Sequence, residues 1–155
     1  MFRNLHIIIC SSANFYRQAF EIKTQLEAAG LKVGIPDTAE RMRQSGDFNV
    51  DHYKTWFNDA SHYHKKAAYM RAHFKKIEEG DAVLVLNYEK HGVPNYIGGN
   101  VLMEMSLAFH LNKPIYILNE IPEGSTFLEE IMGMEPIILH GKLEPLIETL
   151  NPGRT

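Results

Sequence analysis

The chain has 155 residues, of which 45% are hydrophobic and 23% are charged, a composition typical of a single globular domain. Its net charge of −3 gives no electrostatic reason to expect a nucleic acid or an anionic membrane as a partner. The lone cysteine, Cys10, excludes an internal disulfide framework and suits a reducing compartment. Because no stretch is apolar over the roughly 20 residues that span a bilayer and no signal-peptide pattern is evident, we expect a cytoplasmic protein with one domain over residues 1–155.

The spacing of apolar residues predicts strands that alternate with helices. An apolar run at 5–10 predicts a strand buried on both faces, followed by a helix that ends near Gly30 and a second strand at 31–35. Further strands are predicted at 82–86, 114–118 and 136–139, with helices starting at Asn100, over 126–133 and over 143–150. This alternation predicts an α/β fold: one doubly wound, flavodoxin-like five-stranded parallel sheet in the order 2-1-3-4-5, with helices on both faces.

The segment between the second and third strands has two parts. Residues 37–50 are polar and lack a clear period, which predicts a loop or flap beside the carboxyl end of the second strand. Residues 51–79 carry a helical stripe, which predicts one long helix that can be interrupted. The aromatic start of this stripe favours core packing or a subunit interface over a base-stacking platform, so we expect a homo-oligomer.

Polar loops follow the first, third and fourth strands. In open parallel sheets, ligands bind beyond the carboxyl ends of the strands where the strand order reverses. We therefore expect Ser11 and Ser12, the loop at 87–100 and residues 119–120 to meet there. Their hydroxyls, amides and helix starts suit an anion such as a phosphate, although they can also serve only as helix caps. Neither a G-x-G-x-x-G fingerprint nor a P-loop is present, which disfavours a Rossmann dinucleotide site.

Glu104 is the sharpest candidate for chemistry. Gly98 and Gly99 predict a turn that a ligand can approach closely, and Glu104 lies one turn into the helix that follows, at the edge of its apolar stripe. A carboxylate held this way can act as a nucleophile or acid/base, or it can simply complement the helix dipole. The spacing of His62 and His64 does not suit a shared metal, so we expect neither a metal nor a cofactor.

Several motifs resemble the nucleoside 2-deoxyribosyltransferase-like superfamily, which includes deoxynucleotide N-glycosidases. They are the strand Gly80–Asn87, the run Asn95–Asn100, Glu104 with Ala108, and Lys113–Tyr116. The resemblance covers residues 80–119 and extends loosely to the first strand and its serines, whereas residues 37–72 carry no match.

This resemblance implies a covalent mechanism. Glu104 would attack the anomeric carbon of 2-deoxyribose and displace the base, and another base or water would then resolve the glycosyl-enzyme. The family also implies oligomers whose sites are completed across subunits. It commonly has an aspartate at the end of the third strand, where this chain has Asn87. Asn119 is also an amide and Glu120 is the nearby acid, so the proton donor stays unassigned.

The expected function is cleavage or transfer of the N-glycosidic bond of a (deoxy)nucleoside or its 5′-monophosphate. Glu104 is the expected catalytic residue. Residues expected to bind the small-molecule substrate are Ser11, Ser12, Asn87, Tyr96, Gly98, Gly99 and Asn100. The alternatives are a non-catalytic nucleotide-binding or sensing module on the same fold and, with less support, a flavin- or nicotinamide-binding protein.

Overall fold

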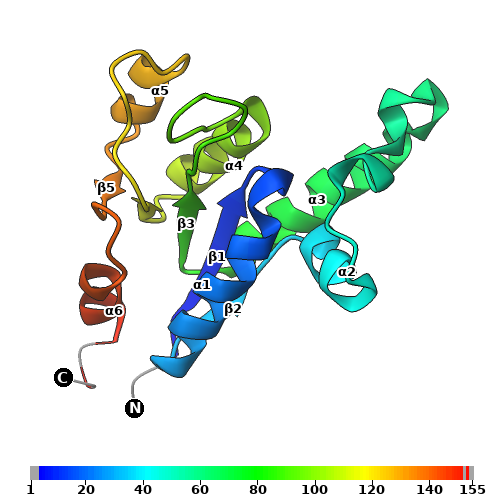
Figure 1. Cartoon of the computed structure of the whole chain (residues 1–155). Coiled ribbons are helices and arrows are strands. Elements are labelled where there is room, and N and C mark those ends of the chain that lie inside the picture. The colour runs from blue at the N-terminus through cyan, green and yellow to red at the C-terminus, as the bar shows by residue number, and fades with distance from the viewer. Residues whose placement is uncertain (1–3, 152, 154–155) are drawn as a thin grey trace.

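Five parallel strands form one sheet in the order β2-β1-β3-β4-β5, as predicted (Figure 1). The computed structural model describes residues 4–151 and residue 153. The strands are β1 (His6–Ser11), β2 (Lys32–Gly34), β3 (Ala82–Leu86), β4 (Ile115–Ile117) and β5 (Ile137–Ile138). The predicted α/β, flavodoxin-like fold is therefore confirmed.

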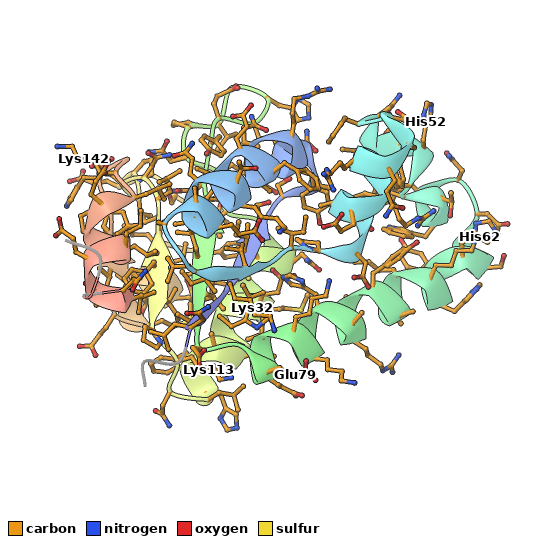
Figure 2. All side chains as sticks on the ribbon, turned by 90° about the horizontal axis from the view of Figure 1, so that it is seen from below. Lys32, His52, His62, Glu79, Lys113 and Lys142 are labelled. Carbon is orange, nitrogen blue, oxygen red and sulfur yellow. The ribbon has the colours of Figure 1, made fainter. Side chains whose placement is uncertain are left out.

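Helices cover both faces of the sheet (Figures 1 and 2). The helices α1 (Tyr16–Ala28) and α6 (Glu144–Leu150) pack on one face, and α3 (Tyr63–Glu79), α4 (Gly99–His110) and α5 (Leu128–Gly133) pack on the other. Side chains of β1 alternate between the two cores: Ile7 and Ile9 belong to the first, and Ile8 and Cys10 to the second. Burial on both faces explains why the strands are continuous apolar runs. Among the described residues, no helix is both long and apolar enough to cross a membrane.

The prediction of a loop at residues 37–50 was wrong, because α2 (Asp37–Ser45) occupies most of this segment. Its buried face is small, consisting of Ala39 and Met42, three residues apart and fully buried. Glu40 lies in the first turn, where a negative charge complements the helix dipole, and Gly46 ends the helix in the left-handed conformation (φ 73°). A nine-residue helix with two buried positions is too short to show a period in the sequence.

The long helix predicted from residue 51 begins only at Tyr63. Three single-turn 3₁₀ helices precede it, at Val50–His52, Thr55–Phe57 and Ala60–His62. The Asp59 carboxylate accepts a hydrogen bond from the Ser61 backbone N–H (3.0 Å), and such local bonds compete with a continuous helix. The last two of these turns and α2 lie beside α3, whose two ends are marked by His62 and Glu79 in Figure 2.

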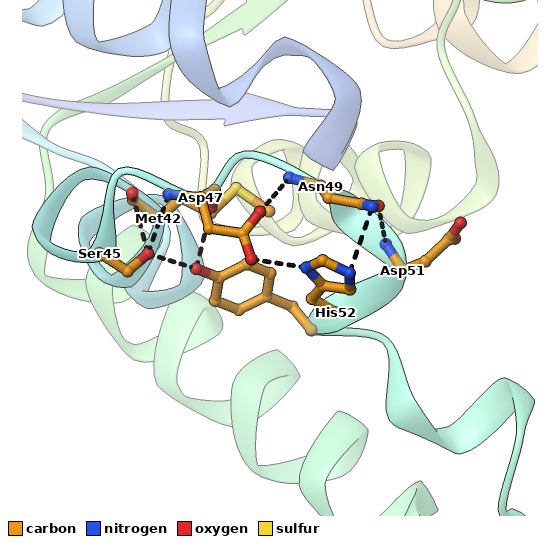
Figure 3. A network of polar contacts seen from close by, with 7 residues as sticks. Met42, Ser45, Asp47, Asn49, Asp51 and His52 are labelled. Atoms are coloured by element: carbon orange, nitrogen blue, oxygen red, sulfur yellow. Dashed lines mark hydrogen bonds and ion pairs between the residues drawn. The ribbon is translucent and has the colours of Figure 1, made fainter.

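Residues 45–53 are tied together by their own hydrogen bonds (Figure 3). The Asp47 carboxylate accepts from the Asn49 backbone N–H (2.9 Å) and lies 2.6 Å from His52 Nδ1. The Tyr53 hydroxyl donates to the Asp47 carbonyl oxygen (2.9 Å) and lies 2.7 Å from Ser45 Oγ. This network fixes the path of the chain from the end of α2 to the residues that enter the candidate site.

Candidate active site

Two adjoining pockets lie beyond the carboxyl ends of β1 and β2, beside the start of α4. We call the first the aromatic pocket, because Tyr53, Trp56 and Tyr69 line it together with His73 and Glu104. We call the second the lysine pocket, because it is lined by Lys54, Lys66 and Lys90 together with Tyr96 and Gly98. The pockets share several lining residues: Ala13, Tyr16, Lys54, Lys66 and Asn100.

Glu104 forms part of the wall of the aromatic pocket. Its side chain belongs to α4 and the residue is only 4% exposed. Oε1 accepts a hydrogen bond from Asn100 Nδ2 (3.0 Å), and Asn100 Oδ1 accepts one from Lys66 Nζ (2.8 Å). Oε2 has no hydrogen-bond partner among the described residues. One carboxylate oxygen is therefore oriented by the protein, and the other is buried beside His73 without a hydrogen-bond partner in the described part of the chain.

Cys10 and His73 complete a buried cluster with Glu104. His73 Nε2 lies 3.7 Å from Cys10 Sγ and 3.9 Å from Glu104 Oε2. One potential ligand atom from each residue falls within 4.8 Å of the others. A thiolate, an imidazole and a carboxylate are donors that Zn²⁺ accepts, so within the described residues this cluster is the place where a metal ion would bind. The metal ion would then bind the oxygen of Glu104 that is otherwise unbonded.

Burial makes this cluster mainly uncharged at neutral pH. It raises the pKa of Glu104 to about 8, against the smaller opposing effects of Cys10, Lys66 and Asn100. Burial, followed by the charge of Lys76, lowers the pKa of His73 to about 4. Burial also raises the pKa of the Cys10 thiol well above its usual range. At pH 7 the imidazole and the thiol are neutral, and the Glu104 carboxyl is mostly protonated.

Tyr16 lines both pockets and carries a hydroxyl group. Burial, followed by the nearby charge of Glu104, raises the pKa of its phenol. The hydroxyl therefore stays protonated through the neutral range and can donate a hydrogen bond to a ligand that spans the pockets.

Most of the predicted site residues line these pockets. Those in the lysine pocket are Ser11, Ser12, Tyr96, Gly98, Gly99 and Asn100. The helix was expected to start at Asn100; it starts one residue earlier, and Asn100 lies in its first turn and bonds Glu104 and Lys66. The residue before the helix, Gly98, provides no side-chain cap.

Asn87 lies elsewhere and lines neither pocket. It is fully buried, its Nδ2 donates to the carbonyl oxygens of Asn119 (2.9 Å) and Glu120 (3.4 Å), and its Oδ1 accepts from the Asn119 N–H (2.9 Å). These bonds join the carboxyl ends of β3 and β4. The exposed Glu120 carboxylate pairs with His140 (2.7 Å) and also lines neither pocket.

The sequence reasoning missed the α3 side of the site. Lys66, Tyr69 and His73 fall at positions i, i+3 and i+7, so they share one face of α3, and all three line the aromatic pocket. The i, i+3, i+7 spacing is the sequence signal that could have identified them. Lys54 had no comparable signal, because its position depends on the 3₁₀ turns.

In comparisons with known proteins, neither a protein-family model nor a curated protein sequence matches the chain significantly. Function is therefore inferred from the residues of the two pockets and from the motif resemblance.

Proposed function

We propose that the protein cleaves or transfers the N-glycosidic bond of a nucleoside or nucleotide, with Glu104 as the nucleophile. The observation that carries this proposal is the state of the Glu104 carboxylate, which is buried, bonded through Oε1 to Asn100 and unbonded at Oε2. A helix holds it at the wall of the aromatic pocket. Attack at an anomeric carbon needs a carboxylate that is held in place and has an oxygen free of hydrogen bonds. The resemblance of residues 80–119 to the nucleoside 2-deoxyribosyltransferase-like superfamily supports the same assignment.

The proposed reaction has two displacement steps at the sugar. In the first, Glu104 Oε2 forms a bond to the anomeric carbon while the bond from that carbon to the base nitrogen breaks, and its electron pair leaves with the base. In this proposal Tyr16, which lines both pockets, donates a hydrogen bond to the departing base, which takes its proton from water. In the second step, water or another base attacks the same carbon and releases the carboxylate.

This proposal predicts how activity depends on pH. Only the ionised carboxylate is a nucleophile, and the pKa of Glu104 is about 8. The value of kcat/KM should therefore rise with pH up to about 8 and then level off. Lys66 favours the ionised form of Glu104, to which it is connected through Asn100.

The direct test is base release from a panel of 2′-deoxynucleosides and their 5′-monophosphates, followed by chromatography. Wild-type protein should release a base, and Glu104→Gln should lose at least about 10³-fold in rate, because an amide is a poor nucleophile. Glu148→Gln, at an exposed position of α6, is the matched control and should keep full activity. A deoxynucleoside that carries fluorine at the 2′ position of its sugar should leave a sugar adduct on Glu104, which mass spectrometry would detect. An adduct on another residue, or an active Glu104→Gln variant, would refute the assignment.

The second candidate is a non-catalytic nucleotide-binding or sensing module. The observation that favours it is the raised pKa of Glu104, which leaves most of the carboxyl protonated at pH 7 and suits hydrogen bonding to a ligand. In that case nucleotides should raise the melting temperature of the wild-type protein without any release of base at any pH.

We also propose that the chain forms a homo-oligomer. The segment expected to provide an interface exposes large apolar side chains, with Phe57 68% and Tyr63 52% exposed. A second subunit would remove them from water. Light scattering at micromolar concentration should give a multiple of 17.8 kDa, and a monomeric mass would contradict this part of the proposal.

The proposed reaction requires no metal. A metal ion at Cys10 and His73 would take Glu104 Oε2 as its third ligand and so block the attacking atom. Exhaustive chelation should therefore leave base release unchanged, and added Zn²⁺ should inhibit it. If chelation abolished activity and a divalent ion restored it, the reaction would require a metal ion.

A further inference from the structure

Three elements that pack against one another each contribute one side chain that can bind a metal ion. These are Cys10 from β1, His73 from α3 and Glu104 from α4 (Figure 1). Cys10 is fully buried, and His73 and Glu104 are 5% and 4% exposed. No other three Cys, His, Asp or Glu residues in the described part of the chain bring their donor atoms this close together. The expectation of no metal rested on spacing along the chain, which does not reveal donors that meet only on folding.

The distances between the donor atoms suit a tetrahedral metal ion. Zn²⁺ binds a thiolate sulfur at about 2.3 Å and an imidazole nitrogen or a carboxylate oxygen at about 2.1 Å, so neighbouring donors lie about 3.4–3.6 Å apart. His73 Nε2 lies 3.7 Å from Cys10 Sγ and 3.9 Å from Glu104 Oε2. The side chains would therefore have to move by only about half an ångström or less to bind one ion together.

The cluster also contains the polar atoms that the protein leaves unpaired. Within the described residues, the buried side-chain nitrogen and oxygen atoms without a hydrogen-bond partner are His73 Nδ1 and Glu104 Oε2. Leaving a buried polar atom unpaired costs stability. The distance of 3.9 Å from Glu104 Oε2 to His73 Nε2 is too long for a hydrogen bond. A metal ion between these two atoms would bind both of them.

The charges of the metal-bound cluster would balance within the protein interior. As ligands, the Cys10 thiolate and the Glu104 carboxylate carry one negative charge each and the imidazole is neutral, so together with Zn²⁺ they have no net charge. The protons that the thiol and the carboxyl lose pass to solvent. Of the lysines whose charges reach the cluster, Lys76 pairs with Asp37 (2.5 Å) and Lys66 donates a hydrogen bond to an amide oxygen (2.8 Å).

The three donors select the kind of metal ion. Thiolate sulfur and imidazole nitrogen favour Zn²⁺ and similar transition-metal ions, whereas Mg²⁺ and Ca²⁺ prefer oxygen ligands. Three protein ligands leave one tetrahedral position for a fourth ligand. Because His73 and Glu104 line the aromatic pocket, the metal ion would enter from that pocket, and water there would supply the fourth ligand.

We propose that Cys10, His73 and Glu104 form a binding site for Zn²⁺, and that bound zinc and a glycosyl group on Glu104 exclude one another. The metal site rests on the geometry and chemistry of the three donors. The mutual exclusion rests on the proposed function, because the metal ion and the anomeric carbon both require Glu104 Oε2. Zinc would therefore be a reversible inhibitor, which a chelator removes.

Cobalt binding tests the site without any measurement of activity, because Co²⁺ accepts the same donors as Zn²⁺. Titration of the reduced, metal-free protein with Co²⁺ should show one bound ion per chain and the charge-transfer absorption band of a cobalt–thiolate bond. Zn²⁺ should abolish this band and should raise the melting temperature of the protein by several degrees. An excess of Mg²⁺ of about 100-fold should do neither.

Variants of the three ligands show whether the ion binds at this cluster. Cys10→Ser, His73→Gln and Glu104→Gln should each weaken Zn²⁺ binding by at least about 100-fold, and Cys10→Ser should also remove the cobalt–thiolate band. If the serine variant does not fold, Cys10→Ala gives the same comparison without placing a hydroxyl group in the core.

Histidines outside the cluster provide the matched control. The rings of His62 and His64 lie close to each other, with centroids 6.4 Å apart, near the start of α3. The double variant His62→Gln/His64→Gln removes two imidazoles and should bind Co²⁺ and Zn²⁺ as tightly as the wild type.

The outcomes for the metal site do not depend on catalysis. A wild-type protein that gives no cobalt–thiolate band would overturn the site. So would Cys10 and His73 variants that bind Zn²⁺ as tightly as the wild type, because the ion would then be held by surface residues. A band that depends on Cys10, in a protein that releases no base from any nucleoside or nucleotide, would support the metal site and refute the proposed function.

If base is released, its response to zinc tests the mutual exclusion. A concentration of Zn²⁺ that saturates the site should slow base release by the wild type at least about tenfold, and a chelator should restore it. The base release that Cys10→Ser retains should not respond to the same concentration of Zn²⁺. Equal base release by the wild type with and without saturating Zn²⁺ would overturn the exclusion.

Discussion

Asn87 and Glu104 are both buried polar residues near the carboxyl edge of the sheet, but their surroundings differ. The side chain of Asn87 makes three hydrogen bonds to the backbone of residues 119 and 120 and lies outside both pockets. Glu104 lies at a pocket wall, and its Oε2 has no partner among the described residues. Buried polar groups are usually hydrogen-bonded because leaving one unpaired costs stability. The side chain of Asn87 is therefore bonded within the fold, whereas one oxygen of Glu104 is not, and under the proposed function that oxygen is the one that reacts.

The largest expected effect is on how the free energy of unfolding depends on pH, and it arises from Glu104. Its pKa rises from the ordinary 4.5 to about 8 on folding, so between these values the folded protein holds a proton that the unfolded chain has released. Stability therefore falls as pH rises from 4.5 to 8, by about 1.4 kcal/mol for each pKa unit of difference. Glu104→Gln removes this dependence and should be more stable than wild type at pH 8, by up to several kcal/mol.

Urea unfolding of both proteins at pH 5 and pH 8 measures the effect. The two should be nearly equal at pH 5, where a neutral carboxyl resembles an amide, and should diverge at pH 8. His73 is unchanged between the two proteins, so its own titration cancels in the difference unless it couples to Glu104. A variant that is less stable than wild type at pH 8 would mean that the ionised carboxylate is a stabilising group, contrary to the comparison.

A smaller loss is expected at Asn87. Asn87→Ala leaves the Asn119 N–H and the carbonyl oxygens of residues 119 and 120 without their side-chain partner. We expect a loss of about 2–3 kcal/mol in the free energy of unfolding, with kcat/KM of the folded protein unchanged. Asn58→Ala, at an exposed position, is the control and should change stability by less than about 0.5 kcal/mol. A stable Asn87→Ala variant with reduced kcat/KM would return Asn87 to the substrate site.

The sequence was sufficient for the fold because the decisive signals are local. Apolar runs such as residues 82–86, every one of which is buried, identify the central strands, and their alternation with helices fixes the sheet order through general connection rules. The short helix α2 was missed because two buried residues make no recognisable period. The 3₁₀ turns were missed because side-chain caps such as Asp59 interrupt a stripe that otherwise continues.

The site was predictable in part for the same reason. Glu104 could be identified from its place one turn after Gly99, which is a local relation. Its contacts with Cys10 and His73 could not, because Cys10 and His73 are 63 residues apart in the sequence and meet only when β1, α3 and α4 pack. The hydrogen bonds of Asn87 could not be predicted, because a polar residue at a strand end can face the crevice or the neighbouring strand, and only the folded structure distinguishes the two.

The smallest effect is expected at Tyr53, which lies at the edge of the site. Like the side chain of Asn87, its hydroxyl group has hydrogen-bond partners within the protein. Tyr53→Phe keeps the ring at the wall of the aromatic pocket and removes the contacts to Ser45 Oγ and the Asp47 carbonyl oxygen (Figure 3). The expected loss is about 0.5–1.5 kcal/mol, and amide hydrogen exchange should become faster over residues 45–54. Because this segment leads to Lys54, which lines both pockets, Tyr53→Phe should also weaken the binding of a nucleoside monophosphate by a few-fold. In the wild type, a bound monophosphate should slow exchange over residues 45–54. Tyr63→Phe removes the hydroxyl of a 52% exposed tyrosine and should change neither measurement. Unchanged exchange over residues 45–54 in Tyr53→Phe would mean that packing alone, without these hydrogen bonds, holds Lys54 at the pocket.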